Sequence, residues 1–243
     1  TTQRRIDALL SSGPEALEAF RAIARAPLTA ADARLDAWAE CVAHDLGDEA
    51  ALAAMREQAR VSRDPTFIVD ALVRAVRTAS TDVDPQLFVA RCAELAGWAD
   101  EQLDDARLAQ WAWERALERM PGDRRVKDEI TRLGVRVLQA DERLAEAERG
   151  ADTHDETVRA DALRAEIRAL FGRPDREHQI LAAVEELLET AGGDPAARTA
   201  LERLIRRAPS EEGSFASEFL ERIAQSPEER TAARIARIEA ALR

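Results

Sequence analysis

Apolar residues recur along the chain at spacings of three and four, which place them on one face of an α-helix. Clear stripes of this kind cover residues 35–42, 68–76 and 180–188. No segment of four or more residues shows the alternation of apolar and polar positions that a half-buried strand needs. The pattern therefore predicts an all-α chain, with helices near residues 3–11, 14–26, 30–45, 49–61, 65–79, 85–101, 104–120, 124–149, 155–171, 176–191, 195–208, 215–225 and 227–242.

Capping signals divide the chain into these helices. In four places a Ser or Asp that can cap a helix precedes a Pro, whose missing N–H costs nothing at the first helical position. Three Gly-Asp pairs combine the end of one helix with the start of the next. The connections are short, which favours antiparallel neighbours. The signals are Asp64-Pro65, Asp84-Pro85, Asp194-Pro195, Ser226-Pro227 (with Glu229 at capping-box spacing), Gly47-Asp48, Gly122-Asp123 and Gly193-Asp194.

Segment 124–149 has a different pattern, because its apolar residues follow a heptad repeat. Two interpretations stay open: one long helix packed on its neighbours, or the seam of a homodimer. The two alanines in the seam favour the first. The polar stretch 148–157 is the best linker candidate, so we divide the chain into an N-terminal helical-repeat region (1–123), the long helix (124–149) and a C-terminal region (150–243). The seam is Val126, Ile130, Leu133, Val137, Ala140, Leu144 and Ala147.

Composition excludes several classes of protein. With 46% hydrophobic residues, ten Gly and nine Pro, the chain is too apolar for a disordered protein and too poor in Gly and Pro for a collagen. Its net charge of −12 argues against a nucleic-acid partner, which needs clustered basic residues. No stretch reaches the roughly 18 apolar residues of a membrane span. No signal peptide is visible, so we expect the cytoplasm by default, with a removed leader left open.

Candidate catalytic chemistry is sparse. None of the three histidines lies in a metal-binding spacing, and no glycine-rich phosphate loop occurs. Cys41 and Cys92 lie inside apolar helical patterns and are expected to be buried thiols, although His44 lies three residues from Cys41. Asp104-Asp105 lacks the third carboxylate of a magnesium cluster and is expected to cap a helix. We therefore expect no catalytic residue, no metal and no cofactor.

One stretch, 90–123, contains a spaced set of small, aromatic and helix-stopping residues. Its positions follow each other at intervals of 12, 4, 3, 1 and 4, and the set resembles the tetratricopeptide repeat. The family prefers a large aromatic, Leu and Tyr where this chain has Ala93, Ala96 and Asp100. Weaker echoes lie at 16–27 and 197–209. The matching residues are Gly97, Ala109, Trp113, Ala116, Leu117 and Pro121.

The resemblance implies antiparallel helix pairs stacked as a right-handed α-solenoid, in which the first helix of each pair lines a groove for a peptide. Carried onto 90–123, it places Arg91, Glu94, Trp98, Glu101 and Gln102 on the groove face. Alternatively, these are ordinary surface residues, with Trp98 packed on the next helix. Trp111 faces away from Trp113 and is a further candidate contact, unless it packs against an adjacent helix pair.

We therefore expect a non-catalytic scaffold or adaptor that binds a protein or peptide, and the acidic charge favours a basic partner. Two other functions stay open. One is a structural homo-oligomer assembled through 124–149. The other is an all-α enzyme whose site is not visible in the sequence.

Overall fold

The computed structural model describes residues 7–8, 13–26, 29–207 and 210–242. These residues form twelve α-helices and one short π-helical turn, with no strand among them. The predicted helix at 3–11 lies mostly outside this part of the chain. The helices are α2 (Gly13–Arg25), α3 (Ala31–His44), α4 (Glu49–Ser62), α5 (Thr66–Thr78), α6 (Pro85–Gly97), η1 (Trp98–Gln102), α7 (Ala106–Arg119), α8 (Arg124–Ala151), α9 (Glu156–Leu170), α10 (Glu177–Ala191), α11 (Pro195–Arg207), α12 (Ser210–Ile223) and α13 (Pro227–Leu242).

Most predicted caps are present. Asp84, Asp105 and Asp123 each accept hydrogen bonds from backbone N–H groups in the first turn of the helix that follows. The capping box is also confirmed, because the Glu229 N–H donates to Ser226 Oγ over 3.1 Å and Glu229 accepts from the Gln225 N–H over 2.7 Å.

Several helix boundaries differ from the prediction by one to five residues. Helix α5 begins at Thr66, one residue later than expected, and Asp64 accepts from the Thr66 N–H over 2.9 Å. Helix α6 ends at Gly97, and the chain continues as the π-helical turn η1. Helix α12 begins at Ser210 instead of 215, and the buried Gly213 lies in its first turn. A Cβ atom on Gly213 would lie 3.4 Å from the Ala240 Cβ, in van der Waals contact, so α12 packs closely on α13 at this position.

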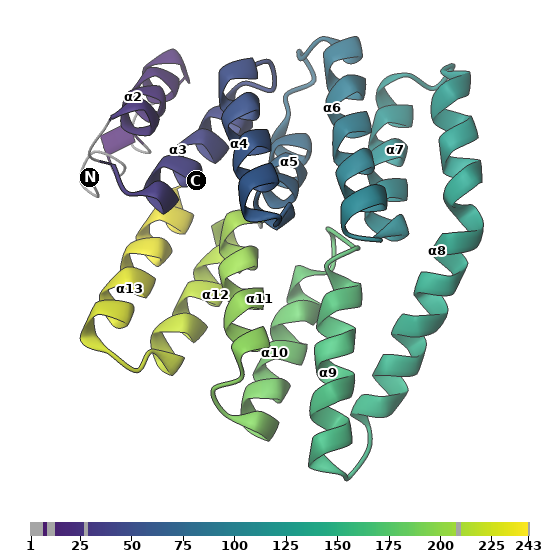
Figure 1. The fold of residues 1–243 in the computed structure, drawn as a ribbon, viewed down its shortest axis with the longest axis vertical. Helices are drawn as coiled ribbons and strands as arrows, with labels where there is room; N and C mark the ends of the chain where they lie inside the picture. Colours follow the sequence, from purple (N-terminus) through teal and green to yellow (C-terminus); the bar gives the residue numbers. More distant parts are fainter. Residues whose placement is uncertain (1–6, 9–12, 27–28, 208–209, 243) are drawn as a thin grey trace.

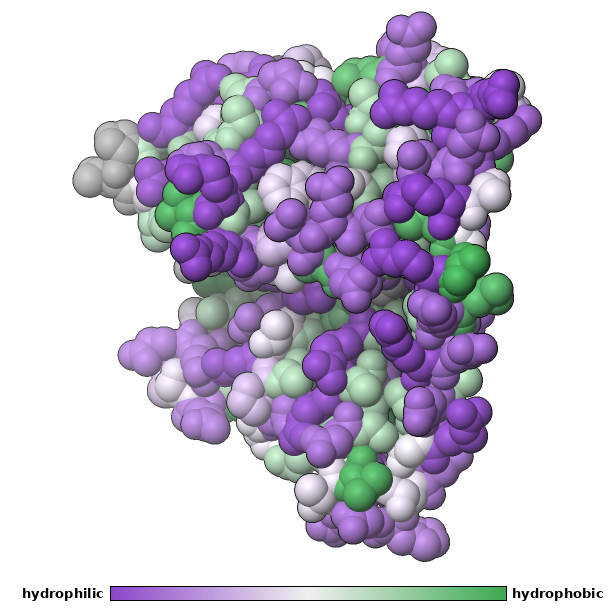
Figure 2. Space-filling model, turned by 45° about the vertical axis from the view of Figure 1, so that its right-hand side comes forward, coloured by the Kyte–Doolittle hydropathy of each residue, from purple (hydrophilic) through white to green (hydrophobic). Residues whose placement is uncertain are grey.

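The helices pack in sequence into two rows (Figure 1). Helices α2–α7 form the upper row of Figure 1, α9–α13 form the lower row, and the long α8 runs along one edge of both. The chain doubles back, so that α11 contacts α5 and α13 ends near α3. Figure 2 shows the two halves with a notch between them at the left.

Each row has its own hydrophobic core, and α8 contributes to both. Val126, Leu133 and Val137 belong to the upper core, whereas Leu144 belongs to the lower one. The heptad positions of α8 therefore pack largely against α7 and α9 of the same chain, as one long helix does. Five of the seven seam residues are buried in this way, whereas Ile130 and Ala140 are half-buried.

A charged cluster joins the two rows where α5 meets α11. Asp70 is fully buried, and its carboxylate accepts hydrogen bonds of 3.1 and 2.9 Å from Arg203. Arg206 lies 3.6 Å from the same carboxylate. The rings of Phe171 and Phe67 lie under Arg203 and Arg206, with centroids 4.0 and 5.3 Å from the guanidinium carbons. Since a buried carboxylate is tolerated only when it is paired, α11 must lie against α5.

We predict that Asp70→Asn lowers the free energy of unfolding by about 3–5 kcal/mol, because it leaves Arg203 and Arg206 without their counter-charge. Chemical denaturation followed by circular dichroism measures the loss. The matched control is Asp128→Asn, which breaks an exposed ion pair to Arg124 and is expected to change the free energy of unfolding by less than about 1 kcal/mol. Equal losses in the two variants would contradict the role of the cluster.

Candidate functional site: a groove between the two rows

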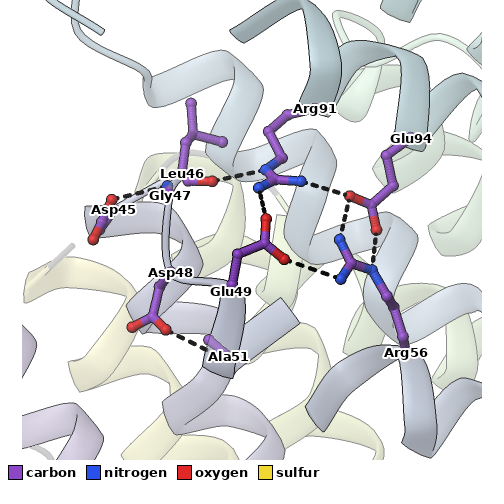
Figure 3. Close-up of polar contacts among 9 residues, drawn as sticks. All are labelled: Asp45, Leu46, Gly47, Asp48, Glu49, Ala51, Arg56, Arg91 and Glu94. Carbon is purple, nitrogen blue, oxygen red and sulfur yellow. Dashed lines mark hydrogen bonds and ion pairs between the residues drawn. The ribbon is translucent and has the colours of Figure 1, made fainter. Parts of the chain in front are cut away.

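Two of the residues predicted for a groove, Arg91 and Glu94, lie together in an ion network between α4 and α6 (Figure 3). Arg91 is 7% exposed and donates to the Leu46 carbonyl over 2.8 Å, to Glu94 over 3.1 Å and to Glu49. Arg56 donates twice to Glu94, over 2.6 and 2.8 Å. The donors of Arg91 are thus engaged within the chain, where they hold α6 against α4 and the loop before it.

The other predicted residues lie apart from this network. Trp98 begins η1 and is half-buried against the upper core, while Glu101 and Gln102 are exposed on the same turn. Trp111 is half-buried on α7 and lines a separate cavity beside Arg173. The structure brings Arg91 and Glu94 together and places Trp111 elsewhere.

The helix pair α6–α7 has a core that agrees in part with the repeat pattern. Ala109, Trp113 and Ala116 are buried between the helices, as expected. Gly97 is different, because a Cβ atom there would meet no other atom within 4 Å. Close approach of helices is therefore not the reason for glycine at this position. The chain turns here instead, through η1, and the Asp105 N–H donates to the Ala99 carbonyl over 2.8 Å.

A groove with a volume of about 270 Å³ lies between α3 of the upper row and α11, α12 and α13 of the lower row. Its floor is apolar and consists of Ile205, Leu220 and three alanines of α13. Charged side chains complete the lining; Glu239 is buried, and the others form the rim. The lining residues are Asp36, Arg198, Glu202, Ile205, Arg206, Leu220, Glu229, Ala232, Ala233, Ala236 and Glu239.

The rim of this groove is acidic. It holds three carboxylates (Asp36, Glu202 and Glu229) and two guanidinium groups, so 2 − 3 leaves one net negative charge when all are ionised. Arg198 donates to Glu229 over 3.0 Å, and this hydrogen bond is the main cause that lowers the Glu229 pKa. Arg206 is turned towards Asp70. Both guanidinium groups are engaged within the chain, and the net negative charge of the rim favours a positively charged partner.

The sequence held no signal for this groove. Its residues come from Asp36 on α3 and from helices more than 150 positions further along the chain. The alanines at 232, 233 and 236 lie inside the helix predicted at 227–242, whose pattern gives no partner for them. Their common surface depends on the doubling back of the chain, which the sequence pattern did not predict.

The two cysteines behave as buried thiols. Burial raises the pKa of Cys41 and of Cys92 to about 12, whereas a thiol nucleophile needs a lowered pKa. The ring of His44, which could have formed a pair with Cys41, stacks on Phe20 with the centroids 5.8 Å apart. Among the described residues, no three His, Cys, Asp or Glu side chains converge on a possible metal site.

Comparison of the chain with protein-family models, with curated proteins and with solved structures gives no match. In the described part of the chain, none of the helices combines the length and the apolar character that a membrane crossing requires.

We predict that Cys41 and Cys92 of the native chain react with Ellman's reagent at pH 8 only at the rate of unfolding. With a pKa of about 12, only about one thiol in ten thousand is ionised at that pH, and both side chains are buried. The absorbance of the released reagent, followed at low and at high denaturant concentration, measures the rate of thiol reaction in the folded and in the unfolded chain. A thiol that reacts within minutes in the folded chain would contradict the burial of these residues.

Proposed function

We propose that the chain is a protein-interaction scaffold or adaptor, whose groove between the rows holds a short segment of a basic partner. The observation that carries this proposal is the combination of an apolar floor with an acidic rim, at a place where two rows of helices meet. Anchor side chains of the partner would be buried on Ile205 and Leu220, while the rim carboxylates would select for Arg or Lys beside them.

The volume of the groove favours a protein partner over a free small molecule. At about 270 Å³ it is smaller than the roughly 300–1,000 Å³ of typical small-molecule sites. A groove of this size suits a few anchor side chains of a longer segment. Because the groove walls are packed helices, they are preformed, which reduces the entropy lost on binding.

The resemblance to the tetratricopeptide repeat adds a proposal about the fold. We propose that α6 and α7 form a tetratricopeptide-like pair in a right-handed array, supported by the burial of Ala109, Trp113 and Ala116 and by the sequential packing of the helices. The proposed groove lies on α3 and α11–α13, away from the α4–α6 network that contains Arg91 and Glu94.

A second candidate function is a structural homo-oligomer assembled through α8. Val135 and Leu138 are 66% and 65% exposed, one turn apart on the helix. They lie outside the heptad seam, so a dimer would use this other side of α8. Exposed large apolar residues on one helix face are a common feature of protein interfaces.

We predict that Ala236→Trp fills the groove and weakens the binding of selected peptides at least tenfold. A display library of random peptides, screened against the wild-type chain, supplies the ligands, and we expect the enriched sequences to be rich in Arg, Lys and apolar residues. The matched control is Ala53→Trp, which places the same side chain on an exposed position of α4. Enrichment of acidic peptides, or equal binding by both variants, would contradict the proposal.

For the second candidate, we predict that a dimer would dissociate in the variant Val135→Glu/Leu138→Glu, because two charges would enter an apolar contact. Light scattering coupled to size-exclusion chromatography measures the mass of the wild type and of the variant. A monomeric wild type at high micromolar concentration would exclude this candidate and would leave the groove proposal intact.

A further inference from the structure

A second cavity, with a volume of about 350 Å³, lies on α7, α8 and α9 where the long helix links the two rows. Alanines from all three helices line it and leave it open. Four arginines face it from different elements: Arg107 on α7, Arg143 on α8, Arg168 on α9 and Arg173 just after α9. It shares no residue with the groove of the proposed function.

Two of these arginines share a single carboxylate. Asp141 accepts a hydrogen bond from Arg173 over 2.7 Å and a two-pronged contact from Arg107, whose Nε lies 3.1 Å away. Within the part of the chain that the structure describes, no acceptor meets Arg107 Nη1 or Arg173 Nε and Nη1. Each guanidinium therefore keeps donors for a further oxygen atom.

The other two arginines have no acidic partner among the described residues. Arg143 is exposed, and Arg168 donates only to the backbone carbonyl of Arg164, over 3.2 Å. The acidic side chains of the cavity do not compensate for them. Asp104 is paired with Arg136 outside the lining, and Asp105 caps α7.

The charges at this cavity therefore sum to a positive surplus. The lining holds four arginines against the three carboxylates of Asp104, Asp105 and Asp141, so 4 − 3 leaves one positive charge when all are ionised. This surplus occurs in a chain whose net charge is −12. Guanidinium groups that converge from several elements on an open cavity are the arrangement that binds oxyanions in a two-pronged manner.

We propose that this cavity is a binding site for a multiply charged oxyanion of the phosphate or polycarboxylate class. Arg143 and Arg168 supply unpaired charge, while Arg107 and Arg173 supply the directed donors on either side of Asp141. The site is independent of the proposed groove, because the two surfaces have no residue in common.

Isothermal titration of the full chain at low ionic strength tests this proposal, with inorganic pyrophosphate and citrate as the two probes. We expect at least one probe to bind at a single site, and the double variant Arg143→Gln/Arg168→Gln to weaken it at least tenfold. The matched control is Arg124→Gln/Arg230→Gln, which removes the same charge from exposed positions outside the cavity. Binding of pyrophosphate alone identifies the phosphate class, and binding of citrate alone identifies the polycarboxylate class.

Asp141→Asn provides a second variant with the opposite expected effect. Removing the carboxylate that competes for Arg107 and Arg173 should tighten probe binding several-fold. Circular dichroism checks that each variant is folded. No binding of either probe at millimolar concentration, or equal weakening by the cavity variant and its control, would overturn the proposal.

Discussion

The arrangement of this protein depends on one buried carboxylate, Asp70, and the arginines of α11 that surround it. Helix packing along each row is local, since every helix lies against its neighbours in the chain. The contact between α5 and α11 is different, because it joins residues 133 positions apart in sequence. Burial of an ionised Asp requires the guanidinium groups to be present, so the two rows meet at a defined place.

Arg207 shows how far this contact excludes water. It is fully buried, and its three side-chain nitrogen atoms have no hydrogen-bond partner among the described residues, although its guanidinium lies 5.2 Å from the ring centroid of Phe171. Burial lowers the pKa of Arg207 to about 10, so the group keeps its charge at neutral pH. Asp70 and Glu177 supply the main nearby negative charge, and both lie at the junction of the rows. Burying the Arg207 guanidinium at the junction is therefore costly, and the nearby carboxylates of Asp70 and Glu177 are needed to offset this cost.

The secondary structure could be predicted closely from the sequence, whereas the site could not. Capping residues such as Asp84 and Ser226 act on the next turn of chain, so their effect is visible in local spacing. The heptad pattern of α8 fitted both packing on neighbouring helices and the seam of a homodimer. Only the positions of α7 and α9 show that helices of the same chain pack against it. The groove residues come from separate helices, and their proximity follows from the Asp70 contact. The resemblance placed Arg91 on a groove face, and its contact with Glu49 could not be predicted because Glu49 lies on a different helix, α4.

The α5–α11 contact holds the two rows together as one unit, and the groove between them is a consequence of this contact. The most direct test is a distance measurement by double electron–electron resonance between spin labels at Arg34 on α3 and Arg230 on α13, both exposed, in a chain whose cysteines are replaced by alanine. We predict one narrow distance distribution, which Asp70→Asn broadens towards longer distances. A broad distribution with Asp70 present, or the same distribution in both chains, would contradict the central role of this carboxylate.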